Sequence, residues 1–167
     1  MTKTINQAVK ARGDREGKYL TLSLAGEEYG IGILKVKELI GMMPITPVPQ
    51  TPSFAKGVIN LRGKVIPVID LRLKFGMEEI AYTERTCIIV VEMTGESGAV
   101  FVGIVVDSVS EVLNIKGNDI VDTPTFGANF DTNFISGMAK MNGGVKILLD
   151  IDKVLSKEEI ILLDKEA

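Results

Sequence analysis

The chain has 167 residues, 46% of them hydrophobic and 25% charged, which is the composition of an ordinary globular protein with one domain or two small units sharing a core. Its net charge of −3 provides no positive field to attract nucleic acid or an anionic membrane, and its apolar runs are too short to span a bilayer. Histidine is absent and Cys87 is the single cysteine, which excludes an intrachain disulfide framework and removes the commonest general base and metal ligand.

The elements predicted along the chain are mostly short strands. Residues 1–17 are polar and lack the apolar core of a signal peptide, so we expect them to form a flexible tail. After them, segments rich in Val and Ile alternate with Gly, Pro and Asn, the pattern of an all-β sandwich or barrel. The predicted strands are Tyr19–Leu24, Glu28–Ile31, Ile45–Val48, Gly57–Leu61, Val65–Ile69, Thr86–Met93, Val100–Val105, Ile120–Val121, Gly137–Met141 and Lys146–Asp150.

Helices are predicted to be few and short. The apolar residues within Ile33–Ile40 have helical spacing, and two further short helices are expected over residues 71–75 and 153–155. Ser156 and Glu159 form the pattern of a capping box, in which each side chain accepts a hydrogen bond from the other residue's backbone amide. This pattern predicts a helix at the C-terminus.

An internal repeat is the most informative pattern in the chain. The stretch "FAKGVINLRGKVIPVIDLRLKF" from Phe54 aligns without gaps with "FISGMAKMNGGVKILLDIDKVL" from Phe134, a spacing of 80 residues. An earlier segment, residues 30–40, aligns with residues 103–113 at a spacing of 73. We therefore predict two similar β-units, each with the order strand, strand, short helix, Pro-rich strand, hairpin and short helix. Each is too small to be stable alone, so they should share an apolar seam.

The two repeats differ at the predicted hairpin tip, which reads "LRGK" in the first and "MNGG" in the second. Asn-Gly is the usual choice for a tight hairpin turn, whereas Arg gains nothing from the positive φ that such a turn requires. We therefore interpret Arg62 as present for its guanidinium, which can form a bidentate pair with a carboxylate. Glu38 is an available partner within the chain, and a simply solvated Arg62 is the alternative.

Catalytic and metal-binding patterns are weak. The stretch "GVINLRGK" comes close to a phosphate loop, but five residues instead of four separate its glycines, and a valine stands where Ser or Thr is needed. The carboxylates of 150–152, and of Asp119 with Asp122, fit helix caps and solvated loops better than a metal site. Cys87 has no imidazole partner and lies in a strand-like run. We therefore expect no enzyme activity, no metal and no cofactor.

Three stretches, "EEYGIGILKVKELI", "TPSFAKGVINLRGKVIPVIDLRLKFG" and "VGIVVDSVSEVL", resemble the CheW family of bacterial chemotaxis coupling proteins, and the resemblance covers about residues 19–163. It implies a mostly β, CheW-like fold of two SH3-like five-stranded β-barrels related by internal duplication around a shared core. The domain would span 18–155, with a subdomain boundary near 80–86 and strands able to exchange between the halves. Residues 156–167 would form the C-terminal helix.

The same resemblance implies a non-enzymatic adaptor. Such proteins join the cytoplasmic tips of methyl-accepting chemotaxis receptors to the regulatory domain of the histidine kinase CheA, so that receptor state controls kinase activity within receptor arrays. We expect a cytoplasmic protein, monomeric in isolation, without nucleic-acid binding or membrane insertion. There are three alternatives. The first is a coupling module of another chemosensory pathway, and the second is a detached kinase regulatory domain or a related coupling protein with a receiver domain. The third is a small β-barrel enzyme or nucleotide binder. No receiver pattern is found, and the missing His disfavours the last.

Family positions can be carried over residue by residue. Cys87 stands where relatives carry Val, and the basic residue expected shortly before Phe126 is replaced by Val121. The predicted receptor-binding residues are Val36, Glu38, Gly57, Arg62, Cys87, Val109 and Val112. Phe126 resembles a family residue that contacts the kinase, and it completes a predicted kinase-binding set with Ile45, Val48 and Val65, which are apolar residues near predicted loops and edges, where exposed patches recruit partners.

Overall fold

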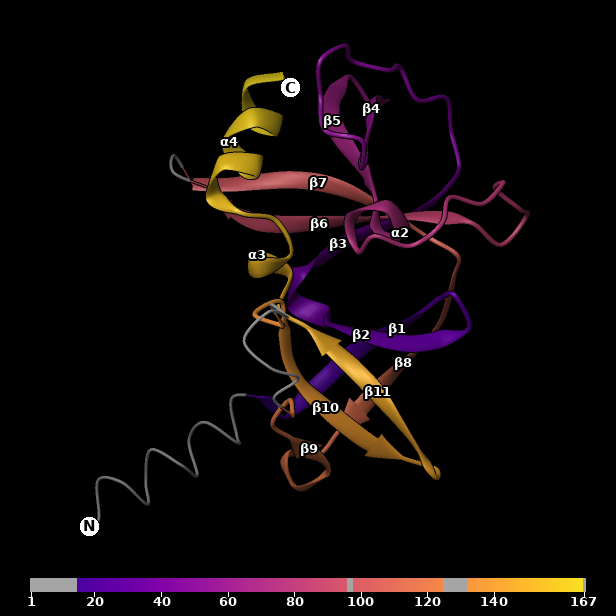
Figure 1. Cartoon of the computed structure of the whole chain (residues 1–167), viewed down its shortest axis with the longest axis vertical. Coiled ribbons are helices and arrows are strands. Elements are labelled where there is room, and N and C mark those ends of the chain that lie inside the picture. Colours follow the sequence, from indigo (N-terminus) through magenta and orange to yellow (C-terminus); the bar gives the residue numbers. More distant parts are fainter. Residues whose placement is uncertain (1–14, 96–97, 125–131, 167) are drawn as a thin grey trace.

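The computed structural model describes residues 15–95, 98–124 and 132–166. Two β-sheets dominate the fold, one above the other in Figure 1, with short helices between them and a longer helix at the C-terminus. The strands are β1 Gly17–Leu24, β2 Glu27–Gly32, β3 Val36–Gly41, β4 Ala55–Leu61, β5 Lys64–Asp70, β6 Cys87–Gly95, β7 Gly98–Val106, β8 Ser108–Ile115, β9 Ile120–Val121, β10 Ile135–Met141 and β11 Gly144–Leu149. The helices are η1 Ile33–Lys35, α2 Leu71–Lys74, η2 Gly117–Asp119, α3 Ile151–Val154 and α4 Lys157–Glu166.

Each sheet contains strands from both halves of the chain. The first barrel has the order β3-β6-β7-β5-β4, and the second barrel has the order β8-β1-β2-β11-β10-β9. The halves meet in two parallel pairs, in which Val68 lies beside Gly103 and Leu148 beside Gly30. The repeat spacings of 80 and 73 residues relate these pairs to each other. The predicted fold class is therefore confirmed, with two duplicated β subdomains and a C-terminal helix, although the second sheet has six strands where five were expected.

The core consists of three apolar clusters. Ile59, Ile66, Val68, Ile88, Val90 and Val105 fill the first barrel. Tyr19, Ile115, Ile120, Ala139 and Leu148 fill the second. The largest cluster lies between the barrels and contains alternate residues of the same strands, such as Ile89, Val91 and Ile104. Strand β6 is therefore buried on both faces, which explains its continuous apolar run "CIIVV".

The prediction of a helix over Ile33–Ile40 is wrong. A single turn of 3₁₀ helix, η1, is followed by strand β3, which pairs antiparallel with β6 from Val36 opposite Val91 to Gly41 opposite Cys87. Burial alternates along β3, so Leu39 points outward where a helix of this spacing would bury it. The same error affects the equivalent segment of the second half, which forms strand β8.

The strand predicted over Ile45–Val48 is also wrong. Only Thr46 pairs, in an isolated bridge to Val58 with two backbone hydrogen bonds of 2.8 and 2.9 Å. Three of the six residues of the segment "PITPVP" are prolines, and proline has no amide to donate to a strand ladder. The other predicted strands are present, with ends shifted by a few residues.

The predicted capping box of the C-terminal helix is confirmed. The Glu159 amide donates to Ser156 Oγ at 3.1 Å, and the Ser156 amide donates to the Glu159 carboxylate at 2.7 Å. Helix α4 stands beside β7 in Figure 1 and buries Ile160 and Leu163 in the cluster between the barrels. The C-terminal segment therefore follows the second barrel in the chain but covers the first.

Candidate protein-interaction surface

The β4–β5 hairpin tip is a two-residue turn, since Leu61 pairs directly with Lys64. Arg62 and Gly63 have φ values of 51° and 85°, and the equivalent Asn142 and Gly143 of the β10–β11 hairpin have 49° and 78°. The two turns therefore have the same conformation, and asparagine suits its first position better than arginine. This comparison supports the interpretation that Arg62 is present for its side chain.

Arg62 forms a bidentate ion pair with Glu38. Its Nη1 donates to Glu38 Oε1 at 2.8 Å, and its Nη2 donates to Oε2. Glu38 belongs to β3 and Arg62 follows β4, so the pair joins the two edge strands of the first barrel. The hydrogen bonds from Arg62 lower the pKa of Glu38, and they outweigh burial, which raises it. The same hydrogen bonds raise the pKa of Arg62. Because the Arg62 side chain is still 70% exposed, a partner can reach the guanidinium.

A hollow of about 260 Å³ lies beside this pair. Apolar side chains, among them Leu61 and Phe101, line it together with the Arg62–Glu38 pair and two lysines. The Lys64 ammonium lies 4.7 Å from the centre of the Phe101 ring. Apolar and cationic groups together suit a partner that carries both apolar side chains and carboxylates.

The predicted receptor-binding residues do not form a single patch. Val36, Cys87 and Val109 pack against the edge of the core between the barrels, and burial raises the pKa of the Cys87 thiol. Glu38 and Arg62 lie on the first barrel, where they contact each other. The structure thus brings Glu38 and Arg62 into contact, whereas Val36 and Cys87 lie at opposite ends of the β3–β6 pair, with Val36 opposite Val91 and Cys87 opposite Gly41.

Leu39 was missed by the sequence reasoning. It is 47% exposed beside Glu38, and its repeat equivalent Val112 is 48% exposed on β8. Val112 belongs to the predicted receptor-binding set. Because the repeat alignment pairs Leu39 with Val112, the sequence could have indicated Leu39 as a candidate as well. Equivalent apolar side chains are therefore exposed on the outer faces of β3 and β8.

Gly57 is buried and offers no side chain to a partner. A Cβ at this position would lie 2.0 Å from the Thr46 carbonyl oxygen and 2.9 Å from Pro47 Cα. Gly57 therefore allows close approach of the segment that contains Thr46. Any effect of this residue on binding would act through that segment.

The predicted kinase-binding residues also differ in exposure. Ile45 packs against the interior of the first barrel, and Val48 is half-buried. Val65 is 47% exposed on β5, as is its repeat equivalent Val145 on β11, at 51%. Phe126 lies outside the described residues.

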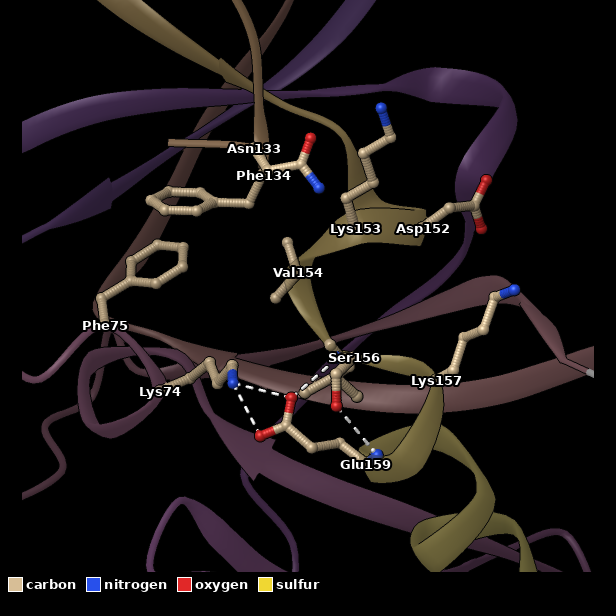
Figure 2. Close-up of a pocket in the computed structure, with 11 residues that line it drawn as sticks. Lys74, Phe75, Asn133, Phe134, Asp152, Lys153, Val154, Ser156, Lys157 and Glu159 are labelled. Atoms are coloured by element: carbon tan, nitrogen blue, oxygen red, sulfur yellow. Dashed lines mark hydrogen bonds and ion pairs between the residues drawn. The ribbon is translucent and has the colours of Figure 1, made fainter. Parts of the chain in front are cut away.

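A larger cleft of about 560 Å³ lies between α2, α3 and α4 (Figure 2). The rings of Phe75 and Phe134 stack with their centres 4.8 Å apart, and Lys74 donates to both carboxylate oxygens of Glu159 at 2.8 and 2.7 Å. Burial opposes ionisation of Glu159, but the Lys74 ion pair and the Ser156 amide together lower its pKa. These contacts anchor α4, and no cluster of acidic or cysteine side chains suited to a metal occurs in the described part of the chain.

Comparison with known proteins places this architecture in a family. The family model of the CheW-like domain matches residues 18–159. The chain belongs to the CheW family. It is 42% identical to the chemotaxis protein CheW of Klebsiella aerogenes over 159 residues, which cover 95% of this chain and 93% of that protein. It is 28% identical to the protein FrzA of Myxococcus xanthus over 152 residues, which cover 90% of this chain and 92% of FrzA.

Solved structures agree with the CheW assignment. The scaffolding protein TtCheW from Thermoanaerobacter tengcongensis superposes with a TM-score of 0.76 at 36% identity, covering 87% of this chain and 98% of that one. The predicted resemblance is confirmed, and the CheW identity supports an adaptor or scaffold role in chemotaxis. Within the described residues, no helix has the length and hydrophobicity to cross a membrane.

Proposed function

We propose that this CheW protein couples methyl-accepting chemotaxis receptors to the histidine kinase CheA, so that receptor state controls kinase activity. The observation that carries the proposal is the Arg62–Glu38 pair, which holds a mostly exposed guanidinium at a hairpin tip whose repeat equivalent is a plain Asn-Gly turn. Bidentate guanidinium groups recognise carboxylates with defined geometry.

The receptor tip, an α-helical hairpin, would dock along the seam between the barrels. Val36, Cys87 and Val109 at the edge of the shared core would contact its apolar face, a helix-in-groove mode of recognition. Arg62 would contact a carboxylate at the side of the helix, with Glu38 holding the guanidinium in position. The CheA regulatory domain would contact the first barrel near Val65.

The test measures binding of a receptor cytoplasmic fragment and of a CheA regulatory domain to Arg62→Ala. We expect receptor binding to weaken while kinase binding and the melting temperature stay close to those of the unmodified protein, since the side chain is exposed. Arg85→Ala, which removes an exposed arginine from the loop before β6, is the matched control. Equal loss of both partners together with a lower melting temperature would make Arg62 structural and contradict the assignment.

Glu38→Gln separates the two members of the pair. The amide keeps the shape of Glu38 but removes its charge, so the guanidinium loses its fixed orientation. We expect receptor binding to fall less than in Arg62→Ala. A larger fall would show that Glu38 itself is the group that the receptor contacts.

A further inference from the structure

A carboxylate bridges the two barrels at the β7–β8 connection, where the chain crosses from the first barrel to the second. Arg72 of α2 donates to Asp107 through Nε at 2.7 Å and Nη2 at 2.6 Å. The same carboxylate accepts the Ala25 amide at 2.9 Å, from the β1–β2 turn of the second barrel. Asp107 therefore contacts a helix of the first barrel and a hairpin of the second.

A second carboxylate does the same at the other crossing, where the chain runs from β2 through η1 to β3. Lys35 of η1 lies 2.8 Å from Asp152 of α3, which follows the second barrel. Asp152 also accepts the Thr94 amide at 2.9 Å, from strand β6 of the first barrel. Figure 2 shows the Asp152 carboxylate directed out of the cleft, away from Phe134.

The internal repeat relates the two sites. Arg72 and Asp152 are 80 residues apart, the spacing of the hairpin repeat, and Lys35 directly follows Leu34, the equivalent of Asp107 at the spacing of 73. The polarity of the ion pair is inverted between the sites: the helix supplies the cation in one and the anion in the other. In both, the carboxylate is the group that accepts an amide from the opposite barrel, so this bridging contact recurs although the residues differ.

We propose that Asp107 and Asp152 are positioning residues that fix the angle between the two barrels and thereby the shape of the seam on which the receptor docks. The inference rests on the proposed function. Its physical basis is proximity in the chain: Lys35 directly precedes Val36, and Asp107 lies two residues before Val109. We therefore expect a change in either ion pair to shift the neighbouring seam residue.

The ionisation of both carboxylates agrees with this role. The hydrogen bonds from Arg72 exceed the effect of burial and lower the pKa of Asp107. Burial opposes ionisation of Asp152, but Lys35 and the Thr94 amide together lower its pKa. Both groups are therefore charged at neutral pH, when charge-assisted hydrogen bonds are strongest.

Distances between spin labels on the two barrels test the proposal. In a Cys87→Ala background, Val65→Cys and Val145→Cys place labels at exposed, equivalent positions of the first and second barrels. We expect a single narrow distance distribution in this reference protein and a broadened or shifted one when Asp107→Asn or Asp152→Asn is added. Unchanged distributions in both variants would overturn the proposal.

Asp122→Asn is the matched control for the distances, because Asp122 is 92% exposed and pairs at 2.9 Å with Arg15, which precedes β1 of the second barrel. We expect its distribution to equal that of the reference. Should Asp107→Asn fail to fold, Lys35→Met removes the cation of the other ion pair and gives the same test.

Receptor binding is measured in the unlabelled full chain with Cys87 present. We expect Asp107→Asn to weaken it on the order of fivefold, a typical lower value for coupling between sites, while binding of the CheA regulatory domain is retained. Broadened distances with unchanged receptor binding would overturn the positioning role. If the unmodified protein does not bind receptor, the proposed function fails, and the distances still decide whether the carboxylates fix the barrels.

Discussion

Replacing Gly57 by alanine separates a structural role from a contact role. Gly57 has a φ of 139°, which L-residues rarely adopt, and its missing Cβ would overlap the Thr46 carbonyl oxygen at 2.0 Å. The overlap is with backbone, so no side-chain rotation can relieve it. We expect Gly57→Ala to push the Thr46 segment away from β4.

The size of the effect follows from two terms. The backbone conformation costs roughly 1–3 kcal/mol for a non-glycine residue. Displacing Thr46 breaks its two hydrogen bonds to Val58, worth about 1 kcal/mol each in net stability. We therefore expect the free energy of unfolding to fall by about 3–5 kcal/mol, which lowers the melting temperature by roughly 6–20 °C in a chain of this size.

Urea unfolding measures this loss, with Gly63→Ala as the matched control. Gly63 also has a positive φ, of 85°, but nothing lies within 4 Å of its missing Cβ. Its replacement should therefore cost only the backbone strain, about 1–2 kcal/mol. Equal losses for the two variants would refute the argument that close approach to Thr46 dominates at Gly57. Full stability of Gly57→Ala with loss of receptor binding would instead make Gly57 a direct contact.

Three further predictions concern other contacts. Glu159→Gln weakens the Lys74 ion pair and the capping box, so urea unfolding should show a loss of about 1–3 kcal/mol; wild-type stability would mean that the apolar face alone anchors α4. The lowered pKa of Asp107 stabilises the fold above its unfolded-state value of about 3.9, and this contribution is lost as pH falls through the lower folded-state pKa. In Asp107→Asn the melting temperature should therefore fall less steeply as pH decreases below about pH 4. The same fall as in the unmodified protein would contradict the role of the Asp107 charge. Val65→Asp should weaken binding of the CheA regulatory domain without changing stability, whereas equal weakening by Val145→Asp would show that the effect is not specific to the first barrel.

The hairpins could be predicted from sequence because they depend on neighbouring residues. The tips of both hairpins, the capping box of Ser156 and Glu159, and the apolar runs of β6 and β7 all follow from local conformation and spacing. The repeat added the equivalence of the two halves, which the parallel pairs bear out.

The errors occurred where tertiary contacts overrode the local pattern. The apolar positions of Ile33–Ile40 have helical spacing, but pairing with β6 makes residues 36–41 a strand. The proline-rich segment around Thr46 has apolar residues suited to a strand but too few amides to join one. Exposure of Leu39 was hidden by the same error, because the helix would have buried it.

The sequence by itself determined that Arg62 is unusual, since the Asn142 turn supplies an internal comparison for the same conformation. Only the tertiary structure decided which residue Arg62 contacts. Its partner Glu38 lies on the other edge strand of the first barrel, and that edge is brought near by burial of apolar side chains shared among five strands. The bridging carboxylates Asp107 and Asp152 likewise acquire their partners only when the two halves exchange strands, because packing of the whole core, and no local pattern, sets which distant segments meet.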